Sequence, residues 1–84
     1  MEFCLITFRS VTPAQRGEGH LKRSGFVCTL RRTPKWMEEQ GCGYSLQIRR
    51  RDAEGAVALL KKHRIPFRKV YLQENDEQIR ELTV

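Results

Sequence analysis

The sequence predicts an α+β fold, a ferredoxin-like β-α-β-β-α-β sandwich in which two helices cover one face of an antiparallel sheet. Four short segments are rich in the apolar, β-branched and aromatic residues that strands favour. Two longer segments repeat apolar residues with the spacing of a helix. The segments follow one another as strand, helix, strand, strand, helix, strand, which is the order that defines this fold.

The first half of the chain contains a strand, a helix and a second strand. Residues 3–8 form a continuous apolar run, which is typical of a central strand. Thr12 is a suitable N-cap for a helix that we expect to end near Ser24. Gly25 follows as the C′ residue, because glycine adopts a positive φ at little cost. Residues 26–30 then predict the second strand.

The second half repeats this arrangement in the order strand, helix, strand. Residues 44–48 alternate apolar and polar side chains, as a half-buried strand does. Asp52 is expected to cap a second helix over residues 53–63, whose apolar residues fall on one stripe. Residues 67–72 predict the fourth strand, and the tail over residues 74–82 could form a short helix.

The composition allows a single core. The chain has 84 residues, of which 39% are apolar, so we expect one domain over residues 1–73 and an acidic tail over residues 74–84. Residues 1–73 contain 15 Lys and Arg against 6 Asp and Glu, within a net charge of +6 for the whole chain. A basic body favours acidic partners or anionic ligands, unless the tail folds back onto it or its surface is simply solvated.

The distribution of apolar residues argues against a membrane protein. No stretch approaches the roughly 20 apolar residues that span a bilayer, and residues 1–10 lack the features of a secretory leader. We therefore expect a cytoplasmic protein without a membrane partner.

Nucleic-acid binding is a minor alternative. If Tyr44, Leu46 and Ile48 face the helices, the outward residues of that strand are Ser45, Gln47 and Arg49, none of them aromatic. The run over residues 49–51 could contact phosphate or could be a solvated turn between strand and helix.

Motifs for an enzyme, a cofactor or a metal are absent from the sequence. His20 and His63 lie near the predicted helix ends, where we expect surface residues or helix C-terminal cations. The three cysteines are an odd number with no C-x-x-C spacing, so reduced thiols are expected rather than a zinc site. Cys4 and Cys28 lie within apolar runs and are expected to be structural.

Cys42 is the residue that packing explains least well. It lies between Gly41 and Gly43, whose missing side chains allow tight backbone conformations and close approach of other groups. Positive charge nearby would lower the pKa of the thiol and raise its thiolate fraction. The alternative is a small buried apolar residue. The upstream segment that would stabilise the thiolate consists of Arg31, Arg32, Thr33, Pro34 and Lys35.

These motifs resemble a family of small bacterial domains described as putative selenium/sulfur carrier-like proteins. The resemblance covers residues 3–72 and is carried by three segments: Thr7-Phe8-Arg9-Ser10 with Ala14, Glu18, Leu21 and Gly25; Thr33-Pro34-Lys35 with Cys42-Gly43 and Leu46; and Leu59-Leu60 with Ile65 and Tyr71. The chain departs from the family after the first strand, where Ser10-Val11-Thr12 lacks the usual histidine. It departs again before Cys42, where Glu38-Glu39-Gln40-Gly41 replaces serines.

The resemblance implies a protein that is not an enzyme and that carries sulfur or selenium on Cys42 as the acceptor thiol. The implied partner is a donor or acceptor protein of sulfur or selenium. The alternative is a non-catalytic ferredoxin-like interaction or dimerisation module, with a possible homodimer. A third possibility is binding of phosphate or nucleic acid by the basic surface.

Overall fold

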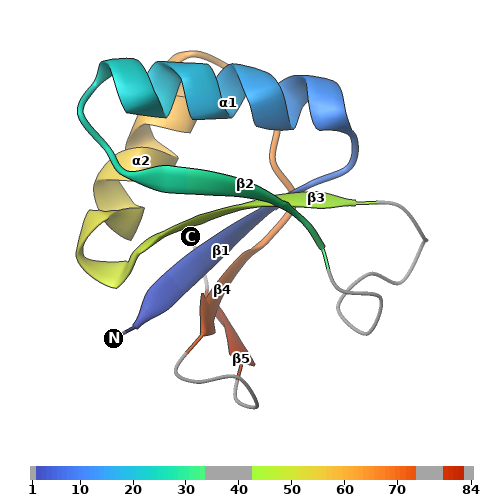
Figure 1. Ribbon diagram of the computed structural model, residues 1–84, viewed down its shortest axis with the longest axis vertical. Helices are drawn as coiled ribbons and strands as arrows, with labels where there is room; N and C mark the ends of the chain where they lie inside the picture. The colour runs from blue at the N-terminus through green and yellow to red at the C-terminus, as the bar shows by residue number, and fades with distance from the viewer. Residues whose placement is uncertain (1, 34–42, 74–78, 83–84) are drawn as a thin grey trace.

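The computed structural model describes residues 2–33, 43–73 and 79–82, which form two helices on one face of a five-stranded antiparallel sheet (Figure 1). The strands lie side by side in the order β2-β3-β1-β4-β5. This confirms the predicted α+β class and its β-α-β-β-α-β order, to which β5 adds an edge strand. The elements are β1 (Phe3–Phe8), α1 (Val11–Arg23), β2 (Cys28–Arg32), β3 (Tyr44–Arg49), α2 (Arg50–Lys62), β4 (Val70–Gln73) and β5 (Ile79–Leu82).

β1 is the central strand, as its apolar run predicted. It pairs with β3 on one side and with β4 on the other. Its alternate residues Cys4, Ile6 and Phe8 are fully buried in the core under the helices. A strand with neighbours on both edges and side chains buried on both faces has few positions that tolerate polar residues.

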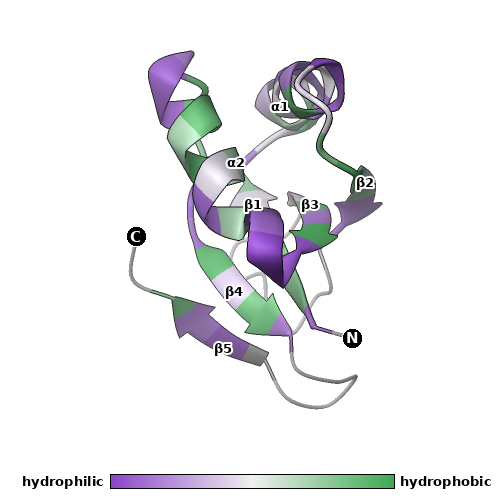
Figure 2. Cartoon of the chain, turned by 90° about the vertical axis from the view of Figure 1, so that its left-hand side faces the viewer, coloured by the Kyte–Doolittle hydropathy of each residue, from purple (hydrophilic) through white to green (hydrophobic). Residues whose placement is uncertain are grey.

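The two helices pack on the sheet through the apolar stripes that the sequence shows. Figure 2 shows both helices on the same side of the sheet, with β5 at the edge farthest from α1. Gly17 lies at the contact of α1 with the core: a Cβ there would be 3.0 Å from Leu60 Cδ2 and 3.4 Å from Leu46 Cδ1. A side chain at this position would crowd Leu60 and Leu46, so Gly17 allows α1 to pack closely on the core. The buried helix residues are Ala14, Gly17 and Leu21 of α1 and Ala53, Ala56, Val57 and Leu60 of α2.

Both predicted helix N-caps are wrong by a few residues. α1 has Ser10 at its N-cap position instead of Thr12, and α2 has Arg49 instead of Asp52. In each case the helix begins within two residues of the preceding strand, so the topology decides where it starts and the capping preference does not. Gly25 has φ 90°, which confirms it as the C′ residue of α1.

The predicted helix in the tail is also wrong, because Ile79–Leu82 form β5. These residues pair antiparallel with β4, from Val70 opposite Leu82 to Gln73 opposite Ile79. The outer edge of β4 offers unpaired backbone groups, and this pairing satisfies them. β2 and β4 also begin later than the sequence predicts, at Cys28 and Val70.

The sheet face that the helices do not cover is less exposed than the alternation in β3 suggests. Ser45 points to this face as predicted, but it is only 1% exposed. It lies opposite Thr7 on β1, which is also buried, as is Leu5 two residues earlier. The sequence therefore predicted correctly which face of the sheet Ser45 occupies, but it did not predict that Ser45 is buried there.

Candidate functional site

The candidate site lies at the end of the sheet where β1 and β2 finish and β3 begins. Phe8 and Arg32, the last residues of β1 and β2, both lie opposite Tyr44 in the register. Beyond this pair, the Thr33 N–H donates a hydrogen bond of 3.0 Å to the Gly43 carbonyl. Thr33 and Gly43 are therefore held side by side, at the points where the chain enters and leaves residues 34–42. The start of α1 lies on the same side of the molecule (Figure 1).

The structure brings together four of the residues predicted for the site. Arg31 and Arg32 are exposed at the end of β2, whereas Thr33 and Gly43 are buried at its base. The others lie outside the described residues, so their roles stay predictions; they are Pro34, Lys35, Gly41 and Cys42.

The two arginines of β2 project to opposite faces of the sheet, because side chains alternate along a strand. Arg31 shares its face with Gln47, and its Nη1 donates a hydrogen bond of 3.1 Å to Gln47 Oε1. Arg32 lies opposite Tyr44 on the other face. Positive charge is thus present on both faces of the strand end next to Thr33.

Thr33 is a buried residue whose side chain carries a hydroxyl. The residue is 6% exposed, and its Oγ1 has no hydrogen-bond partner within the part of the chain that the structure describes. A buried hydroxyl without a partner costs about 1–3 kcal/mol. Such a group is rare in native proteins and calls for a specific explanation, such as a functional role.

A β-bulge lies beside this site, where the chain approaches β4. The Thr7 N–H donates to the Lys69 carbonyl at 2.8 Å, whereas the Thr7 carbonyl accepts from the Arg68 N–H at 2.7 Å. The Lys69 N–H is left over and donates to the Thr7 hydroxyl at 3.0 Å. Arg68 and Lys69 thus both lie opposite the single residue Thr7. A bulge of this kind redirects side chains at the end of a sheet.

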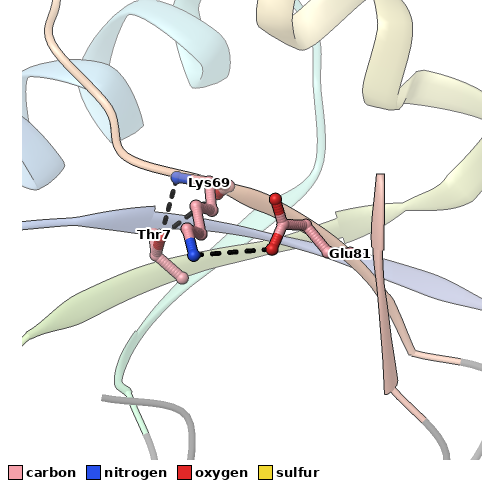
Figure 3. A network of polar contacts seen from close by, with 3 residues as sticks. All are labelled: Thr7, Lys69 and Glu81. Carbon is pink, nitrogen blue, oxygen red and sulfur yellow. Dashed lines mark hydrogen bonds and ion pairs between the residues drawn. The ribbon is translucent and has the colours of Figure 1, made fainter. Parts of the chain in front are cut away.

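The bulge positions the Lys69 ammonium over β5. Its Nζ lies 3.5 Å from Glu81 Oε1, and both side chains are about half exposed (Figure 3). An exposed ion pair contributes only about 0–1 kcal/mol. The Thr7 hydroxyl, which also donates to the Lys69 carbonyl at 3.1 Å, therefore holds this segment more firmly than the ion pair does.

Replacing Thr7 by valine is expected to destabilise the protein by about 1–3 kcal/mol. Valine keeps the shape of threonine but removes the acceptor of the part-buried Lys69 N–H. The urea midpoint measures the effect. The control is Thr29→Val, at an exposed position of β2, for which a change within about 0.5 kcal/mol is expected. Equal midpoints for the two variants would show that the hydroxyl does not hold the bulge.

Sequence reasoning missed three cations at this end of the molecule. Arg9 directly follows β1, and Arg68 and Lys69 form the bulge before β4. All three are exposed. The predicted strand order contained the signal, because in this topology β1 ends at the same end of the sheet at which β4 begins.

The other two cysteines are part of the core. Cys4 and Cys28 are free thiols that are 0% and 6% exposed. Burial raises the pKa of both thiols above the ordinary value. The prediction that they are structural agrees with this burial, because a buried neutral thiol is a poor nucleophile.

The two histidines lie against each other at the ends of their helices. The rings of His20 and His63 stack with centroids 4.2 Å apart. Desolvation, and then the positive charge of His63, Arg23 and Arg16, lowers the pKa of His20 from its ordinary value. His20 lies in the last turn of α1, as predicted, and its surroundings disfavour the charged form.

The arginine run lies at the opposite end of the sheet, where β3 continues directly into α2. It borders a surface hollow of about 690 Å³ that is also lined by Glu2 and Glu54. Arg50 Nη1 lies 3.0 Å from Glu2 Oε1. The carboxylates offset part of the positive charge there.

Within residues 2–33, 43–73 and 79–82, no group of three or more His, Cys, Asp or Glu side chains is arranged to hold a metal ion. Neither α1 nor α2 is long and apolar enough to cross a membrane.

Comparison with known protein families gives one match. The model of the family described as "Putative Se/S carrier protein-like" matches residues 3–72. Comparison with curated proteins and with solved structures gives no match. The matched residues include β1 to β4, both helices and both sides of the candidate site.

Proposed function

The chain belongs to the putative Se/S carrier protein-like family, and on that premise we propose that it carries sulfur or selenium on a single acceptor thiol, Cys42. The observation that supports this choice most is the burial of the other two cysteines. The chain contains three cysteines, and two of them are enclosed in the core with raised pKa values. Cys42 is the remaining thiol, and it directly precedes Gly43 at the candidate site.

The electrostatics of this end of the sheet support an anionic sulfur. Arg31 and Arg32 are exposed on the two faces of the strand that leads to residues 34–42. α1 starts on the same side of the molecule, and the N-terminus of a helix favours negative charge. Positive groups favour the thiolate over the thiol.

The unsatisfied hydroxyl of Thr33 supports a second role. It lies at the base of the segment that contains Cys42 and has no acceptor among the described residues. A thiolate or persulfide is an acceptor for such a donor. We therefore assign Thr33 as a positioning residue for the anionic sulfur.

The proposed transfer needs no oxidant or reductant. The Cys42 thiolate attacks the outer sulfur of a donor persulfide, R–S–S⁻, and forms a new S–S bond. The old S–S bond breaks, and the donor leaves as the thiolate R–S⁻. The product is a Cys42 persulfide, which passes its outer sulfur to an acceptor thiolate by the same exchange; selenium would follow the same route.

The pH dependence of alkylation by neutral iodoacetamide tests this proposal. We expect the Cys42 thiol to titrate below about 8.5, the ordinary value. Thr33→Val should raise that pKa by about one unit, since a hydrogen bond to a charged group contributes about 1.5 kcal/mol or more.

The Thr33→Ser variant is the matched control, because it keeps the hydroxyl and should keep the low pKa. The Cys42→Ser variant identifies the signal that belongs to Cys42. A wild-type pKa of 8.5 or above would contradict the proposal. Equal pKa values for Thr33→Val and wild type would remove the role of Thr33 alone.

The alternative of an interaction or dimerisation module has less support. Among the described residues, the one large apolar side chain that is exposed is Val27, at 58%. A single exposed apolar residue is normal on a protein surface and does not form a docking patch. The homodimer therefore stays a prediction.

A further inference from the structure

The end of the sheet at the candidate site concentrates positive charge from separate parts of the chain. We call this set the basic end. Arg9 follows β1, two arginines end β2, and two cations precede β4. These elements are far apart in the sequence, and the fold brings their ends together (Figure 1). The basic end consists of Arg9, Arg31, Arg32, Arg68 and Lys69, all exposed.

Two of these side chains contact neighbouring strands. Lys69 is paired with Glu81 on β5. Arg31 donates a hydrogen bond to the neutral side chain of Gln47 on β3. The five side chains together bring five positive charges to this end of the sheet.

The spread of these cations sets the size of the ligand. They extend from β2 across β3 and β1 to β4. Neighbouring strands lie about 4.8 Å apart, so the cations span about 14 Å. One small anion contacts one or two guanidinium groups, whereas a span of this size fits the acidic surface of a macromolecule.

The aromatic residues at this end argue for a protein over a single-stranded nucleic acid. Bases bind such surfaces by stacking on exposed aromatic rings. Phe8 is buried in the core here, and Tyr44 and Phe67 pack against it. Among the described residues, the aromatic rings at the basic end therefore pack against the core, and none of them is fully exposed for stacking.

We infer that the basic end is a docking surface for an acidic protein that donates or accepts the carried atom at Cys42; this rests on the proposed function. Opposite charges speed up association and orient the partner. The acidic partner would meet the sheet end, with its reactive sulfur next to the segment between Thr33 and Gly43.

Two activated peptides test this inference. Both have the same length and one cysteine activated as a 2-pyridyl disulfide; one carries several glutamates and the other carries lysines at the same positions. The Cys42 thiolate attacks the peptide sulfur, a mixed disulfide forms and 2-thiopyridone leaves, and its absorbance gives the rate. An uncharged peptide of the same design measures the reactivity of Cys42 by itself.

At low salt we expect the acidic peptide to react about tenfold or more faster than the basic one. The ratio should approach one near 1 M salt, where the Debye length is about 3 Å. In the double variant Arg9→Gln/Arg68→Gln, most of the rate difference between the acidic and the basic peptide should disappear. The control is Arg51→Gln, because Arg51 is exposed at the start of α2, about 17 Å away along the strands.

Each outcome decides the inference. A rate ratio near one at low salt would contradict the proposal of a docking surface. If the uncharged peptide still reacted normally in that case, the proposed carrier function of Cys42 would not be affected. Equal loss in Arg51→Gln would indicate net charge instead of the basic end. Stronger inhibition of the acidic peptide by a single-stranded RNA than by a polyglutamate of equal charge would assign the surface to nucleic acid and overturn the inference.

Discussion

The Cys42→Ser variant is expected to take up no sulfur from a polysulfide donor, whereas wild type gains the mass of one sulfur atom. Serine has no sulfur to form the S–S bond, and both other thiols are enclosed in the core with raised pKa values. Mass spectrometry of the intact protein measures the loaded fraction. The expected effect is a complete loss, since the two cysteines that remain, Cys4 and Cys28, are buried.

The matched control for this experiment is Cys28→Ala. Cys28 lies in β2, four residues before the end of the strand, and is 6% exposed. This variant loses a few buried contacts but should load as fully as wild type. If Cys42→Ser still took up sulfur and Cys28→Ala did not, the proposal would be contradicted, because a core thiol would then be the acceptor.

Replacing Phe8 by alanine is expected to destabilise the protein by about 3–5 kcal/mol. Phe8 is 0% exposed, is among the largest fully buried side chains, and lies opposite Tyr44 at the end of β1. At about 0.05–0.15 kcal/mol per residue, a domain of this size has a total stability of about 4–13 kcal/mol. The loss would therefore remove a large part of the stability, and urea denaturation measures it.

The control for Phe8→Ala is Val27→Ala, at the exposed position before β2. A change within about 0.5 kcal/mol is expected there. A loss below about 1 kcal/mol for Phe8→Ala would show that the core collapses around the missing ring, contrary to the packing described here. Because Phe8 directly precedes Arg9, we also expect the charge preference at the basic end to fall in any Phe8→Ala protein that stays folded.

Much of the fold could be predicted because its local signals agree with each other. The apolar run of β1 needs two neighbouring strands, and the stripes of α1 and α2 need one sheet face to cover. The helix starts were placed less well. Only two residues separate the end of β1 at Phe8 from α1, and α2 follows β3 directly after Arg49.

The candidate site could be predicted only in part. The spacing of Arg31, Arg32 and Thr33 before Cys42 was visible as a basic loop. Arg9 and Arg68 could not be associated with it by spacing, since they lie far from it along the chain. The burial of Thr33 has no signature in sequence, because it depends on how β2 and β3 pair and on the contact between Thr33 and Gly43.

The sequence by itself determined which segments of residues 3–72 form strands and helices, which side of each faces the core, and which cysteine lies outside the apolar runs. These properties follow from local periodicity and side-chain chemistry. The tertiary structure alone decided that Ile79–Leu82 become β5 and that Ser45 is buried on the face away from the helices. These depend on contacts between distant segments, whose free energy is gained only when the whole sheet forms.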